Sequence, residues 1–467
     1  MIINHKGIKR FILLIFFFVF SFGQGLPNSM ALTIEEEREL GRHMLSQIQN
    51  YFEMEEDSFV NDYINDLGSF LVQSLENRPF DFNFYVIRSN QVNAFATAGG
   101  HIFVFSGLIE MVDSVDELAA VLCHEIGHVT ARHISRRIEK GKKMNLAIMA
   151  GVLAGMMIGG EAAAPIVIGS AAAGMQTQLN YTREDERQAD QLGFKYMDRA
   201  GLNPASSISV NEKLRQNNLI GTNMPPPYLL THPLEAERMA NINAMLNDYQ
   251  PKKSGGMAHR FEEEFPFFKT IVWAVSAEPR IAEQKFSARL ADRPDSYVDH
   301  LGLGIVLKAK AEYPAAIEHL QMALPGVPDS VAVKRYLAEL YLLMGKDQEG
   351  IGLLKEILEE NSRDIAAMSI LAKGYLDLEQ YSEAISLFRK LTYIKPVKDD
   401  VFYNLGVAYG RQDLLGPAHY NFGIYFQKTG DPAKAEFHFN KAYEYAGGDL
   451  ELKALIDKAS QHRIRGK

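Results

Sequence analysis

The sequence predicts an α+β, mainly α fold in two parts: a mostly helical domain with a small sheet, followed by an α-solenoid. Three observations support this. Helical stretches flank short apolar segments of strand length at 81–87 and 101–105. A histidine motif at 124–128 lies on a long predicted helix. Beyond about residue 262, small and large apolar residues recur every 34 positions, the period of stacked helical hairpins.

The N-terminal residues 1–31 differ in composition from the rest of the chain. Lys6, Lys9 and Arg10 precede an uninterrupted apolar run from Phe11 to Phe20. A basic start, a short apolar run and small residues after it are typical of a cleavable signal peptide. The run is too short for a membrane-spanning helix, which needs about 20 residues. We therefore expect an exported protein.

Charge and cysteine content exclude two function classes. The formal net charge is −9, and removal of the basic leader makes it more negative, so nucleic acid is not an expected partner. The single cysteine, Cys123, excludes an intramolecular disulfide. It lies within the apolar side of the motif helix, where we expect a small buried residue; a redox role is the alternative.

Four segments are expected after the leader. Residues 32–249 have a mixed pattern of helices and strands, and the polar, glycine-containing residues 250–262 are typical of a linker. The repeats follow over 263–447, and 448–467 is expected to be a C-terminal helix or tail.

The motif helix carries the first candidate chemical groups. Ser114 and Glu117 match a capping box, and the helix is expected to continue through Glu139. His124 and His128 are four residues apart, so both imidazoles point to one side, as in half of a zinc site. The residue after the first histidine, Glu125, is offset from them and can act as a general base.

A zinc hydrolase needs a third protein ligand. His133 is a weak candidate, because nine residues of helix place it about 180° away from the first histidine; we interpret it as a surface or supporting histidine. Glu186 and Asp190 share a helix face, so one can bind zinc while the other orients a ligand histidine. Ala189 and Gly127 would let the two helices approach closely.

The C-terminal repeat has a checkable register. Its small and large positions recur at Ala282, Ala316, Gly350, Ala384 and Ala418, and at Phe286, Leu320, Leu354, Phe388 and Phe422. The spacing resembles that of tetratricopeptide repeats, which implies a concave surface for protein or peptide binding; a purely structural extension is the alternative. Ala435, Phe439 and Ala442 repeat the pattern off register, so the helix with Ala418 is expected to serve two consecutive units.

Several motifs together resemble one family. They are residues 93–108, the histidine motif, residues 183–190, Thr231-His232-Pro233 and Arg238. They are similar to the gluzincin metallopeptidases related to the HtpX heat-shock protease and the CAAX prenyl proteases, over about residues 35–247. Ala98 departs from the family pattern, where proline is common; this affects the local turn and not the chemistry.

The resemblance implies a zincin metallopeptidase domain with one Zn²⁺ per chain. His124, His128 and Glu186 would be ligands, Glu125 the general base and Asp190 the group behind a ligand. Two more residues receive roles only through the resemblance. His232, after the proline-rich loop 225–227, would be a fourth, regulatory ligand that fills the water position, and Arg238 would stabilise the oxyanion; a capping or loop histidine is the alternative for His232.

The resemblance also implies a substrate-binding edge strand, formed by Gly99, Gly100, His101, Ile102 and Phe103; a core strand is the ordinary alternative. For 144–175, rich in Ala and Gly, we expect a buried helical hairpin with some contact to the membrane surface.

The expected function is that of a periplasmic zinc endopeptidase in protein quality control. By resemblance, its clients are unfolded or stalled outer-membrane β-barrel proteins, and its repeats bind the barrel-assembly machinery. A chaperone or adaptor acting through the repeats, with proteolysis secondary, is the alternative. An integral membrane prenyl-type protease is disfavoured, because long apolar spans are lacking.

Overall fold

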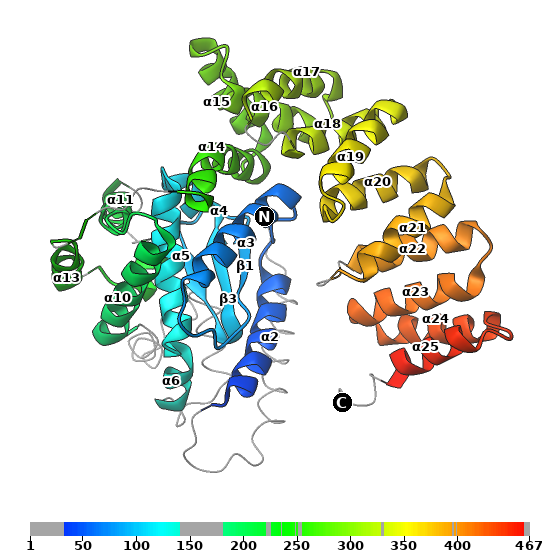
Figure 1. The fold of residues 1–467 in the computed structure, drawn as a ribbon, viewed down its shortest axis with the longest axis horizontal. Coiled ribbons are helices and arrows are strands. Elements are labelled where there is room, and N and C mark those ends of the chain that lie inside the picture. The colour runs from blue at the N-terminus through cyan, green and yellow to red at the C-terminus, as the bar shows by residue number, and fades with distance from the viewer. Residues whose placement is uncertain are drawn as a thin grey trace, which may run out of the picture. The chain divides into compact units, whose positions relative to one another are not determined.

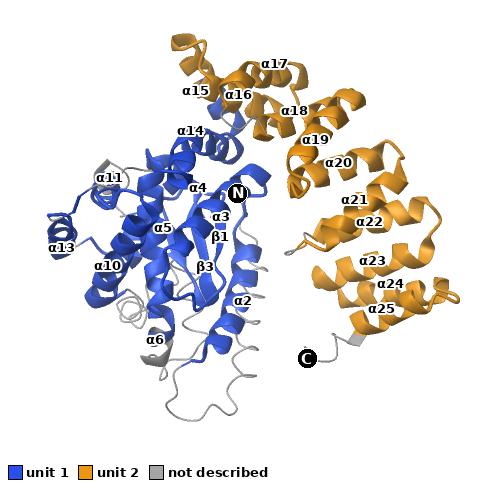
Figure 2. Ribbon diagram, in the orientation of Figure 1, with its two compact units in different colours: residues 1–284 blue, residues 285–467 orange. Residues whose placement is uncertain are grey.

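The computed structural model describes residues 32–140, 181–220, 226–234, 236–247, 249–250, 255–327, 331–394, 397 and 399–461. The expected signal peptide and the segment 144–175 lie outside these residues and stay predictions. No helix in the described part of the chain is long and apolar enough to span a membrane. The chain divides into two compact units, 1–284 and 285–467 (Figure 2).

The first unit is mostly helical, with one small sheet, as predicted (Figure 1). Its elements are α2 (Ile34–Tyr51), α3 (Ser58–Gln73), β1 (Asn83–Ile87), β2 (Ala94–Ala96), the 3₁₀ turn η1 (Ala98–Gly100), β3 (His101–Phe105), α4 (Ser106–Met111), α5 (Val115–Thr130), α6 (His133–Lys140), α10 (Arg183–Ala200), α11 (Ser206–Ile220), α12 (Pro227–Thr231), α13 (Ala236–Leu246) and α14 (Met257–Ser276). Helix α15 (Pro279–Asp292) contains the division between the units.

The sheet has the strand order β1-β3-β2. β1 runs parallel to β3 and pairs Val86 with Val104, whereas β2 runs antiparallel to β3 and pairs Phe95 with Phe103. β3 is therefore the central strand, and all five of its residues are buried. The prediction that this strand forms the sheet edge is wrong, because its continuous apolar run is covered on both faces and paired on both sides. The edge next to the motif helix is β2, which packs against α5.

The motif helix begins as predicted but ends early. Ser114 accepts a hydrogen bond from the backbone N–H of Glu117, so the N-cap is present. The reciprocal half of the capping box is absent, because the Glu117 carboxylate accepts from the N–H of Asp113 at 2.7 Å instead. The helix ends at Thr130, and not near residue 139, since Arg132 adopts a left-handed backbone conformation with φ of 54°. A new helix, α6, starts immediately afterwards.

Small residues bring α5 and α10 together, as the sequence predicted. A Cβ added at Gly127 would lie 2.9 Å from the carbonyl oxygen of Ala189. On the other helix, a Cβ at Gly193 would lie 3.2 Å from the backbone nitrogen of His124. Side chains larger than hydrogen would push the backbones apart at both points, so these glycines set the spacing across which the candidate ligands meet.

Helix α14 begins inside the predicted linker, at Met257, and packs on the first unit. The hydroxyl of Tyr63 on α3 donates to the carbonyl of Phe261 at 2.9 Å, and its ring stacks on Phe268 at 4.1 Å. The ammonium of Lys269 donates to the carbonyl of Val112. The division between the two compact units lies between residues 284 and 285, inside α15. The expected domain boundaries at 249 and 262 stay predictions.

The second unit is a stack of helical hairpins. Its helices are α16 (Tyr297–Ala309), α17 (Tyr313–Ala323), the 3₁₀ turn η2 (Leu324–Gly326), α18 (Val331–Leu343), α19 (Asp347–Glu360), α20 (Ile365–Asp377), α21 (Tyr381–Thr392), α22 (Asp399–Arg411), α23 (Leu415–Lys428), α24 (Pro432–Tyr445) and α25 (Leu450–Gln461). The first helices of four hairpins start at residues 297, 331, 365 and 399, so the predicted period of 34 is confirmed.

Helix α23 takes part in two consecutive hairpins, as the off-register pattern predicted. A Cβ at Gly406 would meet the ring of Phe422, and a Cβ at Gly423 would meet the ring of Phe439 in the same manner. Each glycine precedes its aromatic partner by 16 positions. The same helix is therefore the second member of one pair and the first member of the next.

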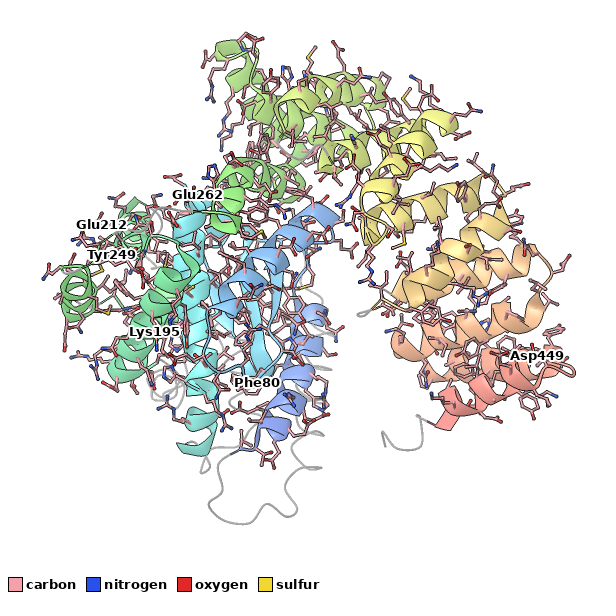
Figure 3. All side chains as sticks on the ribbon, in the orientation of Figure 1. Phe80, Lys195, Glu212, Tyr249, Glu262 and Asp449 are labelled. Atoms are coloured by element: carbon pink, nitrogen blue, oxygen red, sulfur yellow. The ribbon has the colours of Figure 1, made fainter. Side chains whose placement is uncertain are left out.

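Helix α25 closes the end of the stack. Its Leu452 and Ile456 are buried and lie 34 positions after Ala418 and Phe422, so they continue the repeat register. Asp449, labelled in Figure 3, caps this helix by accepting from the N–H of Leu452 at 2.9 Å. The predicted C-terminal helix is thus part of the solenoid core.

Candidate metal centre

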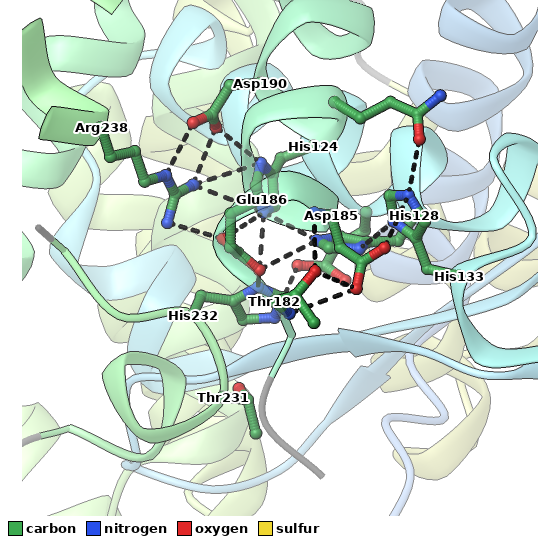
Figure 4. Close-up of polar contacts among 12 residues, drawn as sticks. His124, His128, His133, Thr182, Asp185, Glu186, Asp190, Thr231, His232 and Arg238 are labelled. Atoms are coloured by element: carbon green, nitrogen blue, oxygen red, sulfur yellow. Dashed lines mark hydrogen bonds and ion pairs between the residues drawn. The ribbon is translucent and has the colours of Figure 1, made fainter. Parts of the chain in front are cut away.

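The two histidines of the motif lie on one side of α5, as their spacing predicted (Figure 4). His124 is 5% exposed and His128 is fully buried. Their Nε2 atoms are 3.0 Å apart. Two imidazole nitrogens that converge inside a protein need either a shared proton or a metal ion between them.

The third group comes from the start of α10. Thr182 and Asp185 form a capping box there, which fixes the first turn of the helix. Glu186 follows in that turn and is 3% exposed. Its Oε1 lies 3.4 Å from His128 Nε2, and its Oε2 lies 3.4 Å from His124 Nε2. Of the two acidic candidates, Glu186 faces both histidines.

The fourth group is His232, which directly follows the short helix α12. It is 1% exposed, and its Nδ1 lies 2.9 Å from Glu186 Oε1 and 3.3 Å from His124 Nε2. Within the described ranges, His124, His128, Glu186 and His232 form a group whose ligand atoms all lie within 4.8 Å of one another. Three imidazoles and a carboxylate are a donor set that suits zinc.

Asp190 and Arg238 support this group from one side. Asp190 Oδ1 lies 2.9 Å from His124 Nδ1, so the carboxylate orients the imidazole, as the sequence suggested. Arg238 binds Asp190 with Nε and Nη2, at 2.7 and 2.8 Å, and its Nη1 forms an ion pair with Glu186 at 2.8 Å. The guanidinium is thus engaged by two carboxylates, contacts that fit a positioning residue. The expected role of Arg238 in stabilising the oxyanion stays a prediction.

The charges of the group shift several pKa values. Burial and Arg238 act to lower the pKa of His124, but the Asp190 and Glu186 carboxylates outweigh them and raise it to about 9. Burial holds the pKa of His128 well below its usual range. For Glu186, burial acts to raise the pKa, but nearby cations, above all His232 and Arg238, hold it well below its ordinary value. The metal-free site therefore keeps Glu186 ionised and His128 neutral.

Glu125 is buried beside the four candidate ligand residues. It is fully buried, and neither carboxylate oxygen has a hydrogen-bond partner among the described residues. The imidazole Nε2 of His232 lies 3.5 Å from its Oε1. A buried carboxylate without partners is costly, so its persistence indicates a group that a metal site with water would satisfy.

Two ring side chains contact His128 from outside the group of ligands. His133 is fully buried and its Nδ1 lies 2.8 Å from His128 Nδ1, so its contact is that of a supporting histidine and not of a surface one. The predicted direction, about 180° away from the metal, is wrong because the helix does not continue through residue 133. Sequence reasoning missed Tyr181, whose ring packs on His128 with centroids 3.7 Å apart.

The remaining candidates are placed less directly. Phe103 and its neighbours in β3 belong to the sheet core, and His101 lies 3.2 Å from the hydroxyl of Tyr85 through Nδ1. The short strand β2 packs on α5 and is an edge strand of the sheet. Cys123 is free and buried, and burial raises the pKa of its thiol, which fits the predicted structural role.

Comparison with known proteins supports this reading of the site. Residues 60–246 match Peptidase family M48. The beta-barrel assembly-enhancing protease of Escherichia coli (strain K12) is 26% identical over 389 residues, which cover 80% of this chain and 77% of that one. The putative beta-barrel assembly-enhancing protease of Vibrio cholerae is 33% identical over 232 residues, 49% of this chain and 48% of that one.

A mitochondrial metalloendopeptidase OMA1, from Schizosaccharomyces pombe, is 27% identical over 193 residues, 40% of this chain and 54% of that one. Among solved structures, the chain is similar to a MamA variant, with 22% identity, a TM-score of 0.24 and coverage of 32% of this chain and 96% of that one. It is also similar to YrrB, a TPR protein, with 18% identity, a TM-score of 0.28 and coverage of 43% and 92%. Over residues 60–246 the chain is similar to peptidase family M48, and the family match together with the protease and metalloendopeptidase relatives shows that the chain is a metallopeptidase.

Proposed function

We propose that the chain is an exported, zinc-dependent endopeptidase of protein quality control in the periplasm. One observation carries the proposal: four converging ligand groups stand beside Glu125, a fully buried carboxylate whose oxygens lack hydrogen-bond partners among the described residues. A structural metal site has no use for such a base. The names of the relatives, with the expected signal peptide, support a role at the outer membrane.

The proposed mechanism assigns one task to each group. Zinc, when bound, would polarise the scissile carbonyl and acidify a water molecule. Glu125 would take the proton of the attacking water and deliver it to the leaving amine. His124, His128 and Glu186 would hold the metal. Asp190 would keep His124 oriented through its Nδ1, at 2.9 Å.

We assign His232 a regulatory role as fourth ligand. Its imidazole lies between Glu186, at 2.9 Å, and Glu125, at 3.5 Å, where an attacking water and a substrate carbonyl would have to enter. Its ring also stacks on those of Tyr228 and Tyr181, with centroids 4.6 and 4.9 Å apart. In this arrangement the site is closed, and substrate access requires His232 to withdraw.

The substrate backbone is proposed to align along the sheet rim nearest the motif helix. Strand addition needs an edge with free N–H and C=O groups. β2, residues Ala94–Ala96, is that edge, because β3 is paired on both sides. The residues Gly99–Phe103 would then contribute to substrate binding indirectly, because they hold the edge strand β2 in place.

The repeats are proposed to bring clients to the peptidase. By analogy with the named relatives, those clients are unfolded or stalled outer-membrane β-barrel proteins, which the chain degrades or helps to assemble, and the repeats bind the barrel-assembly machinery. Tethering a client to the same chain raises its effective concentration at the active site. The proposed membrane-surface contact belongs to residues 144–175.

The decisive experiment is Glu125→Gln in the full chain, with zinc content and cleavage of an unfolded outer-membrane β-barrel protein measured in parallel. Loss of the general base should lower kcat by roughly 10²–10⁴-fold while zinc stays bound. Glu184→Gln is the matched control, because that carboxylate is exposed on α10 and pairs only with Arg187 among the contacts seen at the helix surface. Full biological function of Glu125→Gln without any cleavage would favour the adaptor alternative.

A second variant tests the closed site. His232→Ala removes the fourth ligand but keeps the other three, so cleavage should become several-fold faster and zinc binding weaker. Tyr228 and Glu125 lose a neighbour but keep their positions on α12 and α5. Unchanged peptidase activity in His232→Ala would remove the support for regulation by this residue.

A further inference from the structure

We propose that His133 is a positioning residue that selects the metal-binding tautomer of His128. The inference rests on the proposed metal site and concerns how this chain prepares it. His133 is fully buried, and its Nδ1 lies 2.8 Å from His128 Nδ1. When both imidazoles are neutral, they share one proton at this distance, and the network around His133 decides which ring carries it.

The backbone turn after α5 delivers His133 to this place. Arg132 adopts φ of 54°, which L-residues other than glycine rarely do, and it separates the end of α5 from the start of α6. Its guanidinium donates to the carboxylate of Glu37 on α2 at 2.9 Å and to the carbonyl of Leu32. Glu37 is only 2% exposed, so the strained turn is held by a buried ion pair from another helix.

The contacts of His133 at its other ring nitrogen, Nε2, fix the tautomer of this residue. Its Nε2 lies 3.1 Å from Gln188 Oε1, and the same oxygen accepts from Arg136 Nη2 at 3.0 Å. Because a guanidinium can only donate, the amide atom that faces both groups is the oxygen. A carbonyl oxygen can only accept, so His133 carries its hydrogen on Nε2. Asp185 Oδ1, 3.5 Å from the same nitrogen, is also an acceptor and acts in the same sense.

The hydrogen on Nε2 leaves a lone pair on Nδ1 of the neutral His133 ring. The hydrogen between the two Nδ1 atoms must then belong to His128, which donates it. His128 is left with its lone pair on Nε2, the atom that lies 3.0 Å from His124 Nε2 and 3.4 Å from Glu186 Oε1. That is the tautomer a metal ligand needs. The opposite tautomer would present an N–H to the metal.

The two motif histidines are therefore prepared in different ways. His124 is backed by the carboxylate of Asp190, whereas His128 is backed by a neutral imidazole. Asp190 belongs to α10, and His133, from α6, is held by Gln188 of α10. One helix thus supplies a ligand, the carboxylate behind His124 and the amide that fixes the group behind His128.

The test compares His133→Phe with His133→Gln in the full chain, with Zn²⁺ affinity measured by chelator competition. Phe fills the space without an acceptor, so affinity should fall about 10–100-fold, the usual effect of losing a group behind a ligand. Gln offers an oxygen to His128 Nδ1 and should restore most of the affinity. His319→Phe is the control, because it breaks an imidazole pair of the same geometry, 2.8 Å between Nδ1 atoms, in the second unit.

The outcomes separate this inference from the proposed function. If the unmodified protein binds no Zn²⁺, the metal site itself is refuted. If it binds Zn²⁺ and His133→Phe binds equally well, or if Gln is as weak as Phe, only the tautomer selection is refuted. Should the variants fail to fold, long-range ¹H–¹⁵N histidine spectra of the unmodified zinc-loaded protein decide. They must show His128 protonated on Nδ1 and His133 on Nε2; the reverse assignment overturns the inference.

Discussion

At the residue scale, the centre balances one guanidinium against two carboxylates. Arg238 pairs with Asp190 and Glu186, and all three side chains are less than 10% exposed. A buried arginine needs such partners, because its charge cannot be lost. The protein thus keeps Glu186 ionised before any metal arrives, and an incoming dication meets a carboxylate that is already charged.

The raised pKa of His124 predicts proton competition with the metal. Its pKa of about 9 means that at pH 7 the metal-free imidazole carries a proton, which must leave before the nitrogen can bind a metal. Zinc binding at pH 7 should release about one proton, and affinity should rise about tenfold per pH unit up to pH ~9. Chelator competition across pH, with calorimetry in two buffers of different ionisation enthalpy, measures both. An affinity that stays flat from pH 7 to 9 would contradict the prediction.

Sequence reasoning reached the ligands because helix geometry is local. A spacing of four residues places His124 with His128 and Glu186 with Asp190, whatever the rest of the fold does. His133 was out of reach for the opposite reason. Its direction depends on the turn at Arg132, and that turn depends on Glu37, 95 positions earlier in the chain. No pattern within the motif helix contains this information.

At the element scale, the site depends on how closely α5 and α10 approach. Gly127 and Ala189 make that approach possible, and both were recognisable as small residues opposite each other. Strand order was not recognisable in this way. A fully apolar strand such as β3 indicates burial, but a central strand and a covered edge strand have the same composition.

The approach of the two helices can be tested with Gly127→Ala. Alanine is the better helix former, but its Cβ would lie 2.9 Å from a backbone oxygen that cannot move alone. We expect a net loss of about 1–3 kcal/mol in the free energy of unfolding and weaker zinc binding, because Glu186 is displaced from the histidines.

The matched control for that variant is Gly352→Ala, in the interior of α19. There an added Cβ would meet no atom within 4 Å among the described residues. The substitution should stabilise the protein by about 0.5–1 kcal/mol. Denaturant titrations of both variants measure the change in the free energy of unfolding, which should be negative for Gly127→Ala and positive for the control. Equal changes would show that helix propensity, and not the approach of the two helices, determines the effect at Gly127.

At the scale of the whole molecule, the period of 34 predicted the solenoid well, because each hairpin repeats its own contacts. The boundary before the solenoid stays a prediction. The polar residues 250–262 looked like a linker, yet α14 begins at Met257 and packs its aromatic residues on α3. Composition shows where a chain is polar. It does not show which part of the fold the next apolar helix packs against, because that depends on tertiary structure.

Two compact units predict two unfolding transitions in the full chain. The proposed zinc site lies in the first unit, so Zn²⁺ at a concentration of 1,000 Kd should stabilise that transition by about 4 kcal/mol, and a chelator should remove the effect. The second transition should not respond. Phe388→Ala empties a fully buried position of the second unit and should lower only that transition, by about 3–5 kcal/mol. Differential scanning calorimetry measures both; a single transition that shifts in every case would contradict independent units.

The order of the ligand groups along the chain has a consequence for biogenesis. The motif histidines come first, Glu186 follows 58 positions after the second of them, and His232 comes last. A growing chain therefore holds only part of the centre until the segment with His232 is made, and that segment carries the imidazole proposed to close the site. If His232 has that role, the same step completes the centre and closes it. The enzyme would then fold in an inactive form without a propeptide and would need a signal before it could cleave its first client.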